Sequence, residues 1–184
     1  MNGFLKWIVI TLTVVAAGVF IYAYANGGVF NKPLSPKDTV EFKLNELKLK
    51  VFYNRPSKRN RKIFGGLVAY NKVWRTGANE ATTFKTNMPL KIGDTSLAKG
   101  SYTLWTIPNE EHWEVIFNSK QYPWGVDDAM KPMRNPDFDV INIEVPVIHL
   151  NKPVEQFTIA FDNSTDNLSL TMAWDIVKVI VPLK

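Results

Sequence analysis

The sequence predicts a mainly β protein: an antiparallel β-sandwich, jelly-roll-like or barrel-like, preceded by one N-terminal transmembrane helix. Three observations lead to this prediction. Short runs in which apolar and polar residues alternate recur along the chain, and this period of two is typical of half-buried strands. No stretch after residue 25 keeps a long helical period. Residues 7–24 form one uninterrupted run without a charged side chain.

The uncharged run contains 18 residues and would span roughly 27 Å as a helix, close to a hydrocarbon core of about 30 Å. Trp7, Tyr22 and Tyr24 lie where interfacial aromatic residues are found. We therefore expect residues 4–25 to contact the membrane. A signal peptide cleaved after Ala25 is the alternative, with Lys6 as its basic n-region, although the run is longer than a usual h-region. Both interpretations place the rest of the chain on the periplasmic or extracytoplasmic side of a cell membrane.

Three parts are expected: residues 1–25 as anchor or signal peptide, residues 26–38 as a linker rich in glycine and proline, and residues 39–184 as the β-sandwich domain. With 46% hydrophobic residues the chain can build a core without disulfides. It contains no cysteine, which excludes disulfides, thiol nucleophiles and cysteine-based zinc sites. A net charge of +5 slightly favours acidic ligands, and we expect no nucleic-acid partner.

The strand pattern predicts a hairpin from residues 101–107 and 112–118 with Pro108–Glu111 as its loop. That loop would give the cross-strand pairs Thr106–Trp113, Leu104–Val115 and Tyr102–Phe117 on one apolar face. A tight reversal is expected at residues 93–94, and one or two helical turns within residues 122–134. Further strands are expected at residues 47–52, 81–86, 89–92, 95–97, 140–145, 154–161, 168–174 and 176–181.

The segment Val73–Thr82 concentrates hydrogen-bonding side chains around Gly77, directly after an apolar run that Trp74 can anchor in the core. A basic loop lies about twelve residues earlier. Its five cations within eight residues are Arg55, Lys58, Arg59, Arg61 and Lys62. A sheet could bring both segments to one rim, where a guanidinium, an amide and a carboxylate would grip a polar ligand. The candidate ligand-binding residues are Arg55, Arg61, Arg75, Asn79 and Glu80. The alternative is structural: Arg75 pairs with Glu80, and the basic loop is a solvated surface.

A second candidate group is Trp105, His112 and Glu114, in which the indole would be a stacking platform for a sugar. The alternative places Trp105 in the core of a two-layer sandwich. We expect no metal site and no cofactor. The two histidines are far apart, and the run Asp162-x-Ser164-x-Asp166 lacks the glycine and the distal glutamate of a calcium loop, which favours a polar turn. Nucleophile-elbow and phosphate-loop motifs are absent.

Several phrases carry a family resemblance, and the most specific is the eleven-residue run Lys-Val-Trp-Arg-Thr-Gly-Ala-Asn-Glu-Ala-Thr at residues 72–82. The others are residues 53–57, 61–65, 99–108, 113–118 and 124–125. Over roughly residues 36–183 the chain resembles the bacterial family known as domain of unknown function 2911. The resemblance implies an exported, mostly β domain and no assigned activity, so no catalytic residue can be transferred. Asn60 stands where the family phrase has glycine, and asparagine tolerates a positive φ at such a turn.

Three classes of function remain open. The first is a non-catalytic, membrane-anchored envelope module that binds a polar or anionic ligand, either a glycan or a peptide. The second is a hydrolase of an envelope glycan or small polar substrate, using Glu80 with Arg75 as electrophilic support. The third is a scaffold that docks another envelope protein. The mixed-charge cluster, without a nucleophile or metal motif, favours the first class.

Overall fold

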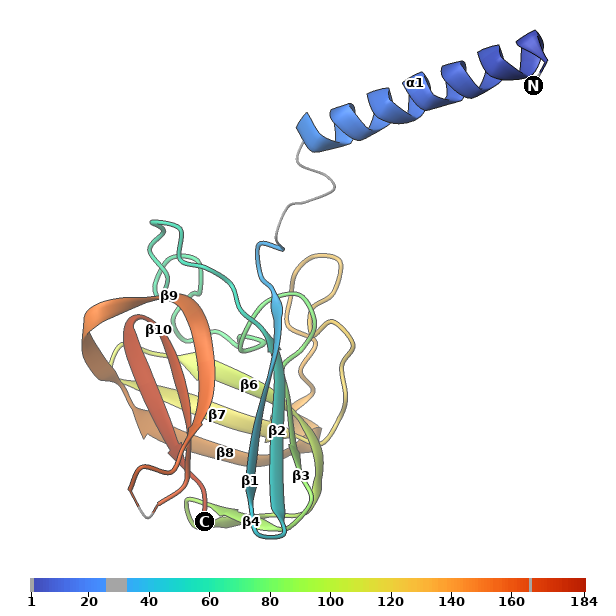
Figure 1. Cartoon of the computed structure of the whole chain (residues 1–184). Coiled ribbons are helices and arrows are strands. Elements are labelled where there is room, and N and C mark those ends of the chain that lie inside the picture. The colour runs from blue at the N-terminus through green and yellow to red at the C-terminus, as the bar shows by residue number, and fades with distance from the viewer. Residues whose placement is uncertain (1, 26–32, 166) are drawn as a thin grey trace. The chain divides into compact units, whose positions relative to one another are not determined.

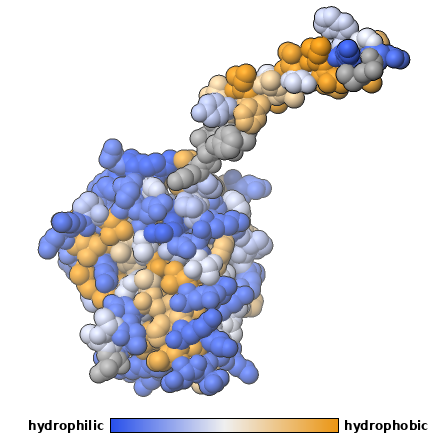
Figure 2. Space-filling model, viewed as in Figure 1, coloured by the Kyte–Doolittle hydropathy of each residue, from blue (hydrophilic) through white to orange (hydrophobic). Residues whose placement is uncertain are grey.

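The computed structural model describes residues 2–25, 33–165 and 167–184. The chain divides into two compact units, Met1–Pro33 and Leu34–Lys184. The first contains an apolar helix and the second consists of antiparallel sheets, so the predicted mainly β fold with an N-terminal helix is confirmed (Figure 1). In Figure 2, hydrophobic residues dominate the helix, whereas hydrophilic residues cover most of the visible face of the second unit.

The helix α1 spans Gly3–Ala25, 23 residues, and none of its side chains is buried. At about 1.5 Å per residue it is roughly 34 Å long, enough to cross a hydrocarbon core. Its two threonines do not expose unpaired hydroxyls, because Thr11 donates to the Trp7 carbonyl at 2.9 Å and Thr13 to the Val9 carbonyl at 2.8 Å. By length and composition α1 could anchor in a membrane, and a signal sequence would form the same helix.

The described part of the second unit contains ten strands, and the pairings between these strands are antiparallel. The largest sheet has six strands in the order β1-β2-β3-β6-β7-β8, a hairpin of β9 and β10 forms a second sheet, and β4 and β5 form a third. The strands are β1 (Lys37–Leu44), β2 (Leu47–Asn54), β3 (Thr83–Thr86), β4 (Leu90–Ile92), β5 (Thr95–Leu97), β6 (Gly100–Pro108), β7 (His112–Asn118), β8 (Asp139–Pro146), β9 (Ile148–Asp162) and β10 (Ser169–Pro182).

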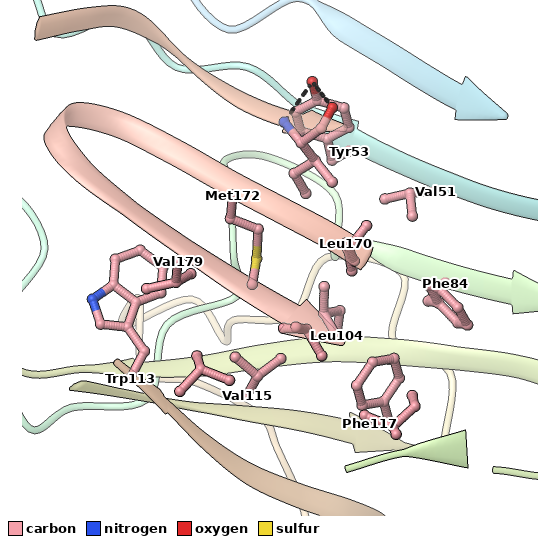
Figure 3. Close-up of a cluster of buried hydrophobic side chains, with 14 of the residues drawn as sticks. Val51, Tyr53, Phe84, Leu104, Trp113, Val115, Phe117, Leu170, Met172 and Val179 are labelled. Carbon is pink, nitrogen blue, oxygen red and sulfur yellow. Dashed lines mark hydrogen bonds between the residues drawn. The ribbon is translucent and has the colours of Figure 1, made fainter. Parts of the chain in front are cut away.

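The core lies between the six-stranded sheet and the β9–β10 hairpin, which makes the unit a sandwich and not a closed barrel (Figure 3). Hydrogen bonds tie the two layers together, among them one from the Ile159 amide to the Tyr53 hydroxyl at 3.0 Å. Fully buried side chains meet across the layers: from the large sheet Val51, Phe84, Leu104, Val115 and Phe117, and from the hairpin Leu170, Met172 and Val179.

The hairpin of β6 and β7 has the predicted strands, but the predicted register was wrong. Strand β6 extends to Pro108, and the Asn109 amide donates to the His112 carbonyl at 2.9 Å, which shortens the loop to residues 109–111. The observed pairs are therefore Pro108–Trp113, Thr106–Val115 and Leu104–Phe117. The shift is two residues, so every side chain keeps the predicted face.

Other expectations also need correction. Residues 122–134 contain no helix; a short 3₁₀ helix, η1, lies at Pro136–Phe138 instead. Gly125 has a φ of +81°, which breaks helical geometry in that segment. Strand β1 begins at Lys37, inside the predicted linker, and residues 26–32 of that linker lie outside the described residues. The two strands expected at 168–174 and 176–181 form the single strand β10, with an irregularity at Asp175.

Candidate functional site

The central turn predicted around Gly77 is rigid. Thr76 and Asn79 have positive φ values of 55° and 53°, which is unusual for a β-branched residue such as threonine. The Trp74 indole donates to the Gly77 carbonyl at 3.0 Å, and the Thr82 hydroxyl donates to the Thr76 carbonyl at 2.7 Å. Gly77 itself has a φ of +152°, and a Cβ there would lie 3.0 Å from the Asn54 carbonyl oxygen. Strained backbone of this kind clusters at functional sites.

Beside this turn lies a hollow of about 460 Å³ that we call the arginine pocket. Its walls come mainly from loops after β2 and β7 that lie at one end of the sandwich (Figure 1), with Ser35 before β1 and Trp174 of β10 completing them. Four of its lining residues are cationic: Arg59, Arg61, Lys72 and Arg75. The described lining contains no carboxylate, and none of these four side chains forms an ion pair with any residue that the structure describes. The pocket is therefore a concentration of uncompensated positive charge.

Arg75 is a partly buried cation of the pocket that keeps donors available to a ligand. Its Nη1 atom makes one long hydrogen bond, 3.5 Å, to the Trp124 carbonyl. Burial lowers the pKa of the Arg75 guanidinium, which nevertheless stays charged. A partly buried guanidinium with unused donors is well suited to bind a carboxylate or phosphate with two parallel hydrogen bonds.

Arg61 is held in a fixed orientation by its own loop. Its Nε atom donates to the Lys58 carbonyl at 3.1 Å, and Nη2 donates to the Ser57 carbonyl at 2.6 Å. The turn before it has positive φ at Arg59 and Asn60, 47° and 57°. Asn60 thus adopts a conformation that asparagine tolerates better than most residues.

An aromatic wall completes the pocket. Trp74 and Trp174 both line it, and their rings stack with centroids 6.0 Å apart and an interplanar angle of 18°. Behind them, Phe64 and Phe157 pack edge-on against Trp74 at centroid distances of 6.3 and 5.0 Å. The expectation that Trp74 packs against the core is met, and the wall is rigid because it belongs to that core.

Arg55 lies outside the arginine pocket lining, directly after β2, and binds residues of β1 and β9. Its Nη1 atom pairs with Asp38 Oδ2 of β1 at 3.3 Å. Its Nε donates to the Phe157 carbonyl at 3.3 Å, and Nη2 donates to Thr158 Oγ1 at 3.0 Å, both on β9. Each nitrogen of this guanidinium has a partner within the fold, which supports a structural role.

Asn79 and Glu80 also lie outside the pocket lining, in one hydrogen-bonded network with Asn54. Glu80 accepts from Asn54 Nδ2 at 2.9 Å and pairs with Lys37 at 2.5 Å, while Asn79 donates to Asn54 Oδ1 at 3.4 Å. The hydrogen-bonded Lys37 ammonium lowers the pKa of the Glu80 carboxyl. The alternative in which Arg75 pairs with Glu80 is therefore not formed: Glu80 pairs with Lys37.

A family model described as "Protein of unknown function (DUF2911)" matches residues 35–183. The chain belongs to the DUF2911 family. The resemblance seen in the sequence motifs is thereby confirmed. Neither the curated proteins nor the solved structures include a match to the chain. The family supplies no activity, so a function for this DUF2911 domain has to be argued from its sites.

The second candidate group does not form a shared surface in the DUF2911 domain. Trp105 is fully buried, with Tyr122 packed against its ring at a centroid distance of 5.3 Å. His112 lies 3.5 Å from a Glu144 oxygen, and Glu114 accepts a hydrogen bond from Asn142 at 2.7 Å. The indole therefore offers no exposed stacking face, whereas the other two side chains contact β8.

No group of three metal-ligating side chains occurs among residues 2–25, 33–165 and 167–184. At the turn after β9, the Ser164 amide donates to Asp162 Oδ1 at 2.9 Å. Hydrogen bonds from Ser164 lower the pKa of the Asp162 carboxyl. These contacts are those of a polar turn, and Asp166 lies outside the described residues.

The site residues predicted from the sequence do not include Arg59, Lys72 or Trp174, which all line the arginine pocket. Arg59 belongs to the basic loop, and Lys72 is the first residue of the family phrase at residues 72–82. Both cations therefore lie in segments that the sequence already indicated. Trp174 comes from β10, about one hundred residues away, and nothing in the sequence links it to Trp74.

Proposed function

We propose that this DUF2911 domain is a membrane-anchored extracytoplasmic module that binds an organic anion in the arginine pocket without catalysis. The observation that carries the proposal is the combination of four unpaired cations with a tryptophan wall and no lining carboxylate. The ligand would carry a carboxylate, phosphate or sulfate group next to a flat apolar part. An acidic sugar and a short acidic peptide with a ring both fit this description.

The size and chemistry of the pocket support this assignment. Its volume of about 460 Å³ lies within the roughly 300–1,000 Å³ of small-molecule sites. Arg61 presents a guanidinium that is already oriented, so little rotational freedom is lost on binding. Most N–H donors of the Arg75 guanidinium have no partner among the described residues and are available to a ligand. The indole of Trp74 is only partly buried, which leaves ring surface for stacking.

The geometry gives no comparable support to the alternative function, a hydrolase that uses Glu80. Glu80 lies outside the lining of the arginine pocket, and two polar partners already occupy its carboxylate. A lowered pKa makes it a poor general acid. A binding role needs only the cations and the aromatic wall, which are present.

The extracytoplasmic location rests on α1. Its apolar length and the basic residue near its start, Lys6, are those of a signal-anchor or a signal peptide. A chain without cysteine is compatible with an oxidising compartment. Labelling intact cells with a membrane-impermeant amine reagent should modify the exposed lysines of the domain; protection equal to that of a cytoplasmic protein would contradict this location.

Titration calorimetry on the full chain in lipid nanodiscs tests the binding proposal. The probes are phenyl phosphate, inorganic phosphate and benzyl alcohol, which separate the charge from the ring. We expect phenyl phosphate to bind most tightly, and Arg75→Met to weaken it about ten-fold or more, because a charge-assisted hydrogen bond contributes roughly 1.5–3 kcal/mol. Lys152→Met removes the same charge from an exposed site on β9 and is the matched control.

Two results would contradict the proposal. One is equal affinity for benzyl alcohol and phenyl phosphate, which would mean that the pocket does not select for charge. The other is an equal loss of phenyl phosphate affinity in Arg75→Met and Lys152→Met, which would mean that net charge alone governs binding.

A further inference from the structure

A second basic hollow lies on the outer face of the six-stranded sheet. It has a volume of about 570 Å³ and runs across β1, β2, β3 and β6. Because Leu49 and Val51 point into the core, their neighbours on β2 point outward. We call this surface the lysine face and define it by Lys43, Lys48, Lys50, Lys85 and Lys99.

The strand register places like charges directly opposite each other on this face. Lys43 is the cross-strand partner of Lys48, and Lys50 is the partner of Lys85. Opposed like charges destabilise a sheet, so a neutral residue at either position would be more favourable for folding alone. Departures from local stability rules of this kind are expected at functional positions.

Little of this charge is compensated. Glu41 is the one acidic residue in the described lining, and it contacts Lys50 at 2.9 Å and Lys43 at 3.9 Å. Lys48, Lys85 and Lys99 have no carboxylate within ion-pair distance among the residues that the structure describes. Three of the five ammonium groups are therefore open to an external anion.

Outside the two hollows, acidic residues outnumber basic residues in the domain. After residue 31 the chain contains 21 basic and 17 acidic residues. The arginine pocket and the lysine face together hold nine of these bases and one of the acids. The remainder therefore has twelve bases and sixteen acids and is net negative. The positive charge is gathered in two hollows, and a field of this kind attracts anions to them.

We propose that the lysine face binds an acidic polysaccharide. Four neighbouring strands are separated by three gaps of about 4.8 Å, or roughly 14 Å in total, which exceeds one small anion and matches a run of charged sugars. Asn87 and Ser101 lie beside the lysines and provide polar groups for sugar hydroxyls. The site shares no lining residue with the arginine pocket, so it does not depend on the function proposed there.

Other polymers fit this surface less well. The described lining contains no aromatic ring, and single-stranded nucleic acids are bound mainly by stacking on such rings. Its one apolar side chain, Leu49, is buried, so a protein partner would find no apolar centre of the kind that protein interfaces have. A stiff sugar chain that carries repeated carboxylates needs neither feature.

The test compares the full chain in nanodiscs of zwitterionic lipid with two variants of equal net charge. Lys48→Gln/Lys85→Gln removes two open charges of the lysine face, and Lys131→Gln/Lys152→Gln removes two exposed charges that line neither hollow. Polygalacturonate is the polysaccharide probe, and inorganic polyphosphate is the comparison. Affinity is measured by biolayer interferometry at several salt concentrations.

We expect polygalacturonate to bind with an affinity that falls as salt rises, because bound cations are released from the polymer. The lysine-face variant should lose at least about ten-fold in affinity and show a shallower salt dependence. The control variant should keep most of its affinity.

Three results would overturn the proposal. Binding of polyphosphate without binding of polygalacturonate would mean that the occupant is a phosphate polymer. Equal losses in both variants would mean that no specific face is involved. Aggregation of the lysine-face variant with unchanged polygalacturonate binding would mean that these lysines keep the outer face of the sheet from associating with other copies instead.

Discussion

Replacing Arg75 by methionine should raise the free energy of unfolding of the ligand-free protein, whereas the same replacement at Arg55 should lower it. Arg75 keeps a partly buried charge that has no ion-pair partner among the described residues, and its desolvation opposes folding. Arg55 pairs with Asp38 and donates two further hydrogen bonds to β9. Methionine keeps the apolar stem in both cases, so packing changes little.

The expected magnitudes follow from these contacts. Removing the Arg75 charge should stabilise the protein by about 0.5–1.5 kcal/mol, within the range of substitutions that relieve a functional strain. Removing the Arg55 guanidinium breaks an ion pair and leaves the Phe157 carbonyl and the Thr158 hydroxyl without their donor. The Arg55 side chain is 29% exposed, which reduces the loss, and we expect about 2–3 kcal/mol.

Urea unfolding of the full chain in a mild detergent, followed by tryptophan fluorescence, measures both variants. In thermal unfolding, 1 kcal/mol corresponds to about 2–4 °C for a domain of this size. Opposite signs would support the distinction between a ligand-binding arginine and a structural one. Equal destabilisation would refute it, because Arg75 would then have a structural partner that the described contacts do not contain.

Three further changes test the fold and the central turn. Gly77→Ala should lower the free energy of unfolding by about 1–3 kcal/mol in urea titrations, since its Cβ would lie 3.0 Å from the Asn54 carbonyl oxygen; an unchanged midpoint would mean that the turn adapts. Phe84→Ala should cost about 3–5 kcal/mol by the same assay, because the ring is fully buried, and a loss below 1 kcal/mol would contradict the core assignment. Glu80→Gln should destabilise the protein at neutral pH but not at strongly acidic pH. The Lys37 ammonium lowers the carboxyl pKa below its usual 4.5, so its contribution is present above pH 4.5 and is lost as the pH falls through the lower folded value; equal destabilisation at both ends of a pH series would refute this.

The alternation of apolar and polar residues was sufficient to predict most of the sheets, because a half-buried strand imposes a period of two. It could not predict the register of β6 and β7, since a shift of two residues preserves that period. The bond between the Asn109 amide and the His112 carbonyl decides the register, and it depends on the backbone of the turn. Strand β1 carries the same alternation at Val40, Phe42 and Leu44, but its first residues fall in the segment assigned to the linker, and no strand was predicted there.

The candidate site could be predicted only where its chemistry is local in sequence. Arg61 and Arg75 lie within short phrases and both line the arginine pocket. Arg55 and Glu80 are also charged residues of such phrases, but residues that are distant in sequence bind them: Asp38 and Lys37 come from β1, while Thr158 comes from β9. Which cation has a partner is decided by tertiary contacts, and no local pattern records those contacts.

The position of a bound anion tests the central claim most directly. Crystals of the protein soaked with p-bromophenyl phosphate would show the ring by the anomalous signal of bromine and the phosphate by its density. We expect the phosphate within hydrogen-bonding distance of the Arg75 guanidinium and the bromophenyl ring against Trp74. Bromine peaks that lie elsewhere, with no density in the arginine pocket, would contradict the account.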